Sequence, residues 1–371
     1  MADPSSKTLV LLFSSLSLLL ASAAPRGPAI GVTYRPSIPG LPARESVVDA
    51  LRSAGATHVL LPDPDPATLR AFLYSGISLL LSLPSSLLPA LASNRSTARR
   101  WLSEHVLPFH PRARVAAISA GHAVLSSSSS PGLASSLLPA VQNLRSACLD
   151  LGLREISIST THSFEILDPA LPPSAARFRE SLAEPYVRPL LDFLSATGSP
   201  FLIDLHPYEM YRKDPAIPIG YALFEEASFG FREDPGSSLR YRNLFDAMAD
   251  AVIAAVEAMG YGELPMVVTG TGWPSGNGLR EATVGYAWRY NHGLVEHLRS
   301  GLGTPMRREG VAAVYVYELF DGPTRRAEEY WGIWWANLSS KYDIVFSGSG
   351  GGGLGTVALG LGCLVLVLLL F

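Results

Sequence analysis

Cysteine is nearly absent from this chain of 371 residues, which contains only Cys148 and Cys363. Cys363 belongs to an apolar stretch at the end of the chain that we expect to be removed during maturation. Cys148 then has no partner within the chain, so we expect a fold that does not rely on disulfides. Because Cys148 lies in a segment with helical spacing, we interpret it as a small buried hydrophobic residue.

The chain also has little charge of either sign, with 29 Lys and Arg against 32 Asp and Glu. No cluster of Lys and Arg of the nucleic-acid-binding type occurs, so we expect no nucleic-acid partner. No Gly-rich phosphate-binding turn follows the first apolar run, since residues 31–36 read Gly-Val-Thr-Tyr-Arg-Pro. A nucleotide-binding open sheet is therefore disfavoured. We expect neither a cofactor nor a metal.

An apolar run too short to span a bilayer lies near the N-terminus. Lys7 precedes the run from Leu9 to Leu20, and the small residues Ala21-Ser22-Ala23 follow it. A charged start, a short apolar region and a small-x-small site are typical of a secretory signal peptide. We therefore expect residues 1–23 to be a cleaved signal, with an uncleaved anchor as the alternative.

The C-terminus carries a second apolar run, and no basic residue follows it. Residues 347–353 are all Ser or Gly, and the tail runs from Leu354 to Phe371. A spanning helix normally has a basic cytoplasmic flank, whereas small residues, a spacer and a terminal apolar tail are typical of a glycosylphosphatidylinositol (GPI) anchor signal. We expect residues 347–371 to be such a signal, with a plain tail anchor as the alternative. The candidate attachment sites are Ser347, Gly348 and Ser349.

Two sequons fit passage through the secretory route. Asn94-Arg95-Ser96 and Asn337-Leu338-Ser339 are acceptors for N-glycosylation. Together with the two ends of the chain, they predict a secreted protein anchored to the outer face of the plasma membrane, in contact with the cell wall. Residues 24–346 are then the folded part.

Short apolar runs alternate with stretches of helical spacing throughout the expected folded part. The expected strands are Ile30–Tyr34, His58–Leu61, Ser78–Leu83, Val115–Ala120, Ile156–Thr160, Phe201–Leu205, Met266–Thr269 and Ala312–Tyr317. The expected helices are Ser46–Ala54, Ala67–Tyr74, Thr97–Phe109, Leu133–Leu151, Tyr186–Ala196, Leu244–Met259 and Val284–Leu298. Eight apolar strands, each followed by a helix or loop, favour a single-domain parallel (β/α)8 TIM barrel over an open doubly wound sheet.

The most informative motif is the run Met-Val-Val-Thr-Gly-Thr-Gly-Trp-Pro-Ser at residues 266–275. It resembles the signature of the plant family 17 glycoside hydrolases, the endo-1,3-β-glucanases, in which the strand ends Glu-Thr-Gly-Trp-Pro-Ser. Further stretches resemble landmarks of that family in the same order: Ile30–Tyr34, His206–Tyr208, Tyr241–Asp246, Tyr317–Asp321 and Tyr330–Gly332. The resemblance covers about residues 29–346 and implies a (β/α)8 barrel of the β-1,3-glucanase type.

The resemblance also implies that both reacting carboxyl groups are missing. The acid/base Glu of the family ends the fourth strand in Gly-Asn-Glu-Val, which corresponds here to residues 121–124, Gly-His-Ala-Val. His122 thus replaces a sugar-contacting Asn, and Ala123 replaces the acid/base. The nucleophile of the signature corresponds to Gly270. A retaining glycosidase needs two carboxyl groups about 5–5.5 Å apart, so we expect hydrolysis to be lost or severely impaired.

Other side chains near the strand ends leave alternatives open. Asp204 and Glu209 are candidate substitute carboxylates, and His122 is either a lone general acid or a polar filler. Aromatic faces stack on pyranose rings while polar neighbours bond the hydroxyls. The residues expected to contact a sugar ligand are Tyr34, His122, Tyr208, Trp273 and Phe320.

The leading expectation is therefore a cell-surface barrel that binds β-1,3-glucan, such as callose, without cutting it. One alternative is an active O-glycosyl hydrolase that uses Asp204 and Glu209. The other is a purely structural wall protein whose cleft is no longer used. Protein partners cannot be predicted from the sequence.

Overall fold

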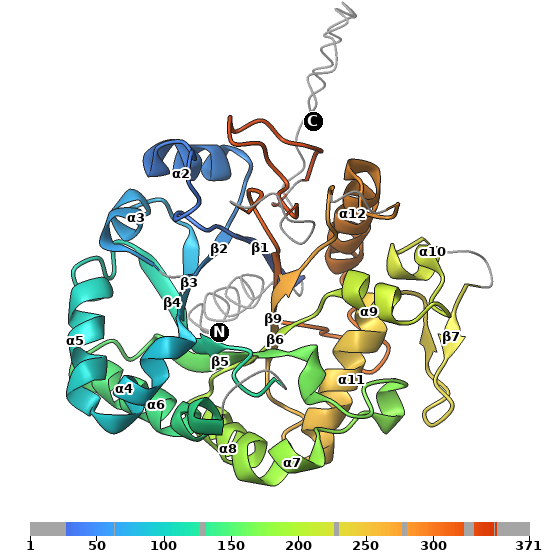
Figure 1. Cartoon of the computed structure of the whole chain (residues 1–371), viewed down its shortest axis with the longest axis horizontal. Helices are drawn as coiled ribbons and strands as arrows, with labels where there is room; N and C mark the ends of the chain where they lie inside the picture. Colours follow the sequence, from blue (N-terminus) through green and yellow to red (C-terminus); the bar gives the residue numbers. More distant parts are fainter. Residues whose placement is uncertain are drawn as a thin grey trace, which may run out of the picture.

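Eight parallel strands close into a barrel that a ring of helices surrounds (Figure 1). This computed structural model describes residues 27–62, 64–126, 131–225, 230–276, 280–322, 330–344 and 346. In order around the barrel, the strands are β1 (Ala29–Thr33), β10 (Ala313–Val316), β9 (Met266–Thr271), β6 (Phe201–Asp204), β5 (Ser157–Ser163), β4 (Arg114–His122), β3 (Ser78–Leu83) and β2 (His58–Pro62). The predicted (β/α)8 TIM barrel is confirmed, and each of the eight expected strands overlaps one of these.

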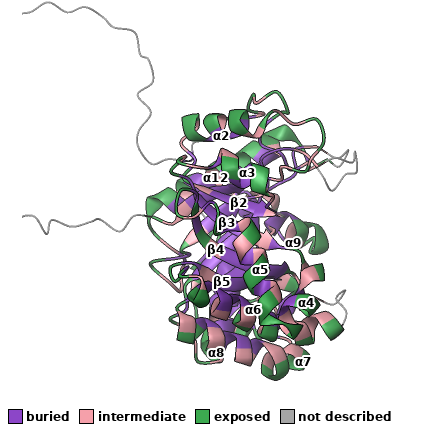
Figure 2. Ribbon diagram, turned by 90° about the vertical axis from the view of Figure 1, so that its left-hand side faces the viewer, coloured by how far each residue is buried: buried purple, intermediate pink, exposed green. Residues whose placement is uncertain are grey.

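The seven expected helices also form on the outside of the barrel. They are α2 (Arg44–Ser53), α3 (Pro66–Ala71), α5 (Arg95–His105), α6 (Pro131–Asp150), α8 (Arg188–Thr197), α11 (Leu244–Ala258) and α12 (Val284–Ser300). Figure 2 shows the strands buried in purple beneath helices whose outer faces are exposed. The alternation of apolar strands and amphipathic helices thus places one apolar layer between the sheet and the helix ring.

Several short elements were not predicted. They include α4 (Leu88–Ser93), α9 (Pro207–Lys213), α10 (Ile219–Ala222), the turn η2 (Phe164–Ile166), and a small hairpin of β7 (Arg232–Glu233) and β8 (Arg240–Tyr241). Elements of this length carry too few residues to show a period of their own. The elements η2 and α9 follow β5 and β6, so they lie on the side of the barrel where the strands end.

A packed layer of side chains fills the interior of the barrel below the strand ends. Leu60, Leu80, Leu202, Val267 and Tyr315 form this inner cluster, and all five side chains are buried. On β1 the matching position is Gly31, where an added Cβ would lie 2.7 Å from the ring of Tyr315. The layer is therefore a floor and leaves no pore through the barrel.

Two residues further along the strands, the interior becomes polar. Because side chains alternate between the two faces of a strand, the residue two positions after a floor residue points into the barrel again. On five strands this next layer supplies Thr33, Ser82, Thr161, Asp204 and Thr269. A polar mouth above an apolar floor is thus encoded in the strand sequences themselves.

Cys148 is fully buried in α6, as predicted, and it is a free cysteine. Burial raises the pKa of its thiol to about 12, so the group is an inert hydrophobic side chain. Among the described residues, no helix is long and apolar enough to cross a bilayer. The predicted signal peptide (1–23) and anchor signal (347–371) lie outside the described residues.

Candidate functional site

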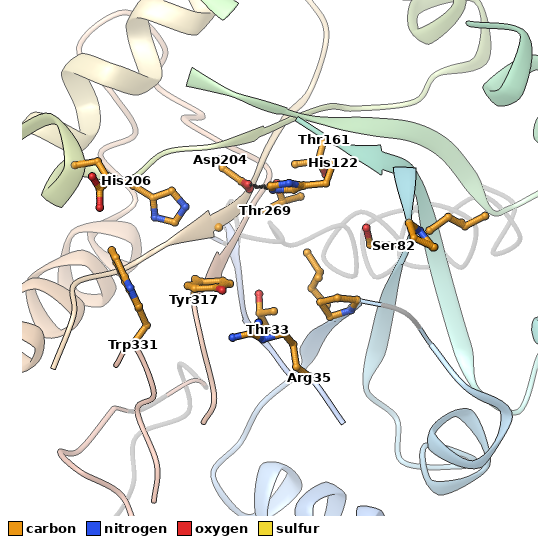
Figure 3. A pocket seen from close by; sticks show the side chains of 16 residues that line it. Thr33, Arg35, Ser82, His122, Thr161, Asp204, His206, Thr269, Tyr317 and Trp331 are labelled. Carbon is orange, nitrogen blue, oxygen red and sulfur yellow. Dashed lines mark hydrogen bonds and ion pairs between the residues drawn. The ribbon is translucent and has the colours of Figure 1, made fainter. Parts of the chain in front are cut away.

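A cavity of about 470 Å³ opens at the carboxyl ends of the barrel strands (Figure 3). We call it the first lobe. Its walls combine hydroxyl, ionisable and aromatic side chains. The residues that line it are Thr33, Arg35, Leu60, Pro62, Ser82, Leu83, Pro84, His122, Thr161, Asp204, His206, Glu209, Thr269, Gly270, Tyr317 and Trp331. The end of the barrel at which this class of fold carries its active site is therefore hollow and polar.

A hydrogen-bonded pair of His122 and Asp204 lies across this lobe (Figure 3). Nε2 of His122, at the end of β4, lies 2.5 Å from Oδ2 of Asp204, at the end of β6. The other carboxylate oxygen accepts a hydrogen bond of 2.6 Å from the hydroxyl of Thr269 on β9. Three strands thus hold one carboxylate, and both of its oxygens have partners.

The pair gives the lobe a fixed charge pattern. The His122 side chain is 61% exposed and that of Asp204 only 12% exposed. The hydrogen bond to Asp204 raises the pKa of His122 against the opposing effect of burial, so the ring keeps its proton to higher pH than usual. His206 behaves in the opposite way, because burial lowers its pKa. Near neutral pH the lobe therefore contains a charged imidazole and a neutral one.

Gly270 lies directly beside Asp204. The two residues pair in the register of β6 and β9. A Cβ added to Gly270 would lie 3.0 Å from Oδ1 of Asp204 and 3.3 Å from its Cγ. The Asp204 carboxylate therefore occupies the space that a side chain at position 270 would need.

A second ion pair closes another wall of the lobe. Nε and Nη2 of Arg35 donate to the two carboxylate oxygens of Glu318 over 2.6 and 2.5 Å. Glu318 is 1% exposed, whereas Arg35 is 28% exposed and reaches the lobe. Nearby, the buried ammonium of Lys341 lies 2.6 Å from Oδ1 of Asp321. Glu318 and Asp321 are thus paired with cations and organise the wall.

Two aromatic side chains face the lobe, Tyr317 and Trp331 (Figure 3). Their ring centroids lie 5.9 Å apart in an edge-on arrangement, and His206 packs against both rings. Trp331 follows β10 at a distance that the strand pattern does not determine, and sequence reasoning missed it as a ligand contact. The Tyr-Trp-Gly landmark at residues 330–332 was the available signal.

The structure corrects the expected stacking contacts at four positions. Tyr34, Tyr208, Trp273 and Phe320 are each at most 2% exposed, and none lines the lobe. Trp273 packs at 4.9 Å against the ring of Tyr208 and donates from Nε1 to the carbonyl of Glu281 over 2.7 Å. These rings are core residues because neighbouring loops fold over them. Of the five expected sugar contacts, His122 alone lines the lobe.

The remaining predicted positions are placed as follows. Ala123 follows β4 with a positive φ of 51°, and its amide donates to the Thr161 carbonyl. Glu209, in the first turn of α9, lines the lobe together with Asp204. Asn94 and Asn337 are exposed, so both expected glycosylation sites are accessible. The expected anchor attachment sites at residues 347–349 lie outside the described residues.

A barrel with a hydroxyl-lined lobe, two facing aromatic rings and a charged pair at its strand ends defines the class of carbohydrate-active (β/α)8 proteins. Comparison with known families makes the assignment specific, because the model of "Glycosyl hydrolases family 17" matches residues 30–346. The chain belongs to glycoside hydrolase family 17.

Individual relatives agree with this assignment. The chain is 38% identical over 331 residues to glucan endo-1,3-beta-glucosidase 10 of Arabidopsis thaliana, covering 86% of this chain and 77% of that protein. It is 34% identical over 324 residues to a glucan endo-1,3-beta-glucosidase of Vitis vinifera, covering 86% and 92%. Among solved structures it is similar to CJP38, a beta-1,3-glucanase and pollen allergen of Cryptomeria japonica. That match has a TM-score of 0.81 and 32% identity, and it covers 86% of this chain and all of the other.

Proposed function

We propose that this family 17 barrel binds β-1,3-glucan, such as callose, and has lost effective hydrolysis. The relatives named above are β-1,3-glucanases, which supports a β-1,3-glucan as the ligand. The hydroxyls and aromatic rings of the first lobe are groups that bind sugar rings in water. The proposal keeps the ligand class of the family and removes the chemistry.

The loss of hydrolysis rests on one observation, the state of the carboxylates in the first lobe. The two positions that the resemblance assigns to acid/base and nucleophile are Ala123 and Gly270, and neither has a carboxyl group. The Asp204 carboxylate beside Gly270 already has hydrogen bonds to His122 and Thr269. A nucleophile needs a free oxygen aimed at the anomeric carbon, and Asp204 has both oxygens engaged.

The second candidate function is an O-glycosyl hydrolase with relocated carboxylates. Asp204 and Glu209 line the same lobe, which is the observation that favours it. Such an enzyme requires the His122–Asp204 pair to open during the reaction. Hydrolysis of β-1,3-glucan that disappears in Asp204→Ala or Glu209→Ala would establish this function in place of binding alone.

Binding is expected to depend on the ring of Tyr317. Replacing it by Leu keeps an apolar side chain but removes the aromatic face, so affinity for a β-1,3-linked glucose oligomer should fall about tenfold. Isothermal titration with laminarihexaose measures this change. Tyr74→Leu is the matched control, because Tyr74 is 76% exposed and precedes β3 at the opposite end of the barrel. Equal affinities in wild type and both variants would remove the first lobe as the binding site.

We further propose that the protein is secreted and held on the outer face of the plasma membrane by a GPI anchor. The terminal segments described above support this location. Phosphatidylinositol-specific phospholipase is expected to release the protein from membranes into the soluble fraction. Retention of the protein, while a known GPI-anchored marker is released from the same membranes, would favour a tail anchor.

A further inference from the structure

A second cavity of about 410 Å³ adjoins the first lobe. We call it the second lobe. The two lobes share one wall, made of His122, Asp204, His206 and Glu209. The hydrogen-bonded pair of His122 and Asp204 therefore stands at the junction of two chambers, and a ligand that fills both must pass over it.

The two lobes differ in their chemistry. The first lobe has four neutral hydroxyl side chains on its walls: Thr33, Ser82, Thr161 and Thr269. The second lobe is lined instead by the apolar side chains Phe164, Leu167, Ala170, Met210 and Met248. Methionine is unbranched and polarisable, so it adapts to an apolar group of irregular shape. The first lobe thus suits a sugar ring, and the second suits an apolar group attached to that ring.

The charges of the second lobe select no ionic ligand. Glu165 and Lys213 form an ion pair of 3.4 Å whose side chains are 47% and 62% exposed. Apart from the shared pair, the other charged residues on its walls are Arg179 and Glu209, which are again one cation and one anion. Two positive and two negative side chains cancel, so an uncharged occupant is favoured.

We propose that the second lobe binds an uncharged apolar substituent, of aryl or acyl type, carried by a glucose unit in the first lobe. This inference rests on the proposed function and narrows its ligand to substituted β-glucosides and their oligomers. The linkage atom between sugar and substituent lies over His122 and Asp204, whose polar atoms face both chambers. Met210, which begins neither lobe's shared wall, contacts the substituent and not the sugar.

The test compares two short probes by titration, methyl β-glucopyranoside and 4-nitrophenyl β-glucopyranoside. A single sugar ring can orient either way in the first lobe, so the test does not depend on the direction in which a glucan chain runs. The nitrophenyl probe is expected to bind at least tenfold more tightly, because its ring leaves water. Laminaribiose, which offers a second sugar in place of the aryl group, is expected to show a smaller gain.

The variant Met210→Gln keeps the length of the side chain and adds a polar amide. It should reduce the advantage of the nitrophenyl probe to below threefold and leave the methyl probe within twofold of wild type. Met259→Gln is the matched control, since Met259 caps α11 and lines neither lobe. The inference is overturned if the nitrophenyl probe has no advantage, if the advantage survives in Met210→Gln, or if laminaribiose gains as much.

Titration with laminarihexaose separates this inference from the proposed function. Tight binding of the hexaose without any gain from the nitrophenyl group would overturn only the role of the second lobe. Absence of binding to the hexaose and to both glucosides would overturn the proposed function as well.

Discussion

Purified protein is expected to release no reducing ends from β-1,3-glucan above background. General acid–base assistance alone contributes about 10²–10⁴-fold, and here the nucleophile position is empty as well. The rate should therefore lie at least ~10⁴-fold below that of a relative with both carboxylates, assayed on laminarin under the same conditions. Ala123 and Gly270 are the physical cause, because neither can transfer a proton or attack an anomeric carbon.

Restoring the carboxylates tests the same idea from the other side. Ala123→Glu with Gly270→Glu should remain near background, because the new side chain at position 270 meets Asp204 at about 3.0 Å. Adding Asp204→Ala clears that space, and weak turnover is expected only in the triple variant. Each single restoration should stay inactive, because acid/base and nucleophile act as a unit. Robust wild-type turnover that Asp204→Ala or Glu209→Ala abolishes would contradict the proposal.

The second large effect concerns stability and the ion pair behind the first lobe. Arg35→Met leaves the carboxylate of Glu318 buried without its bidentate partner, and Glu318 is 1% exposed. Breaking a buried pair from one side costs about 3–5 kcal/mol, so the free energy of unfolding should fall by about that amount. Urea denaturation at neutral pH measures it. Adding Glu318→Gln to Arg35→Met should recover part of the loss, because it removes the unpaired charge.

A surface pair provides the matched control. Arg52 lies 3.6 Å from Asp49, and both side chains are more than half exposed. Exposed pairs contribute at most about 1 kcal/mol, so Arg52→Met should change the free energy of unfolding little. If Arg35→Met costs no more than Arg52→Met, the pair with Glu318 does not stabilise the wall of the lobe.

The sequence by itself determined the barrel and the rim on which the site lies. Periodicity was sufficient for the eight strands because each is a short apolar run bounded by turns or helices. It also placed His122, Asp204 and Gly270 at one rim, since parallel strands of a barrel end on the same side. The absence of carboxyl groups at positions 123 and 270 needs no structure at all, because it is a matter of residue identity.

Only the tertiary structure decided which side chains meet. Trp273 follows the strand that ends beside the lobe, yet the rings of Tyr208 and Tyr290 cover it, so it is a core residue. The pairing of His122 with Asp204 joins residues 82 positions apart in the chain. The second lobe depends in the same way on how η2 and α9 fold over the strand ends. Local pattern specifies which face a side chain takes, whereas its contacts depend on distances between segments that only the closed barrel brings together.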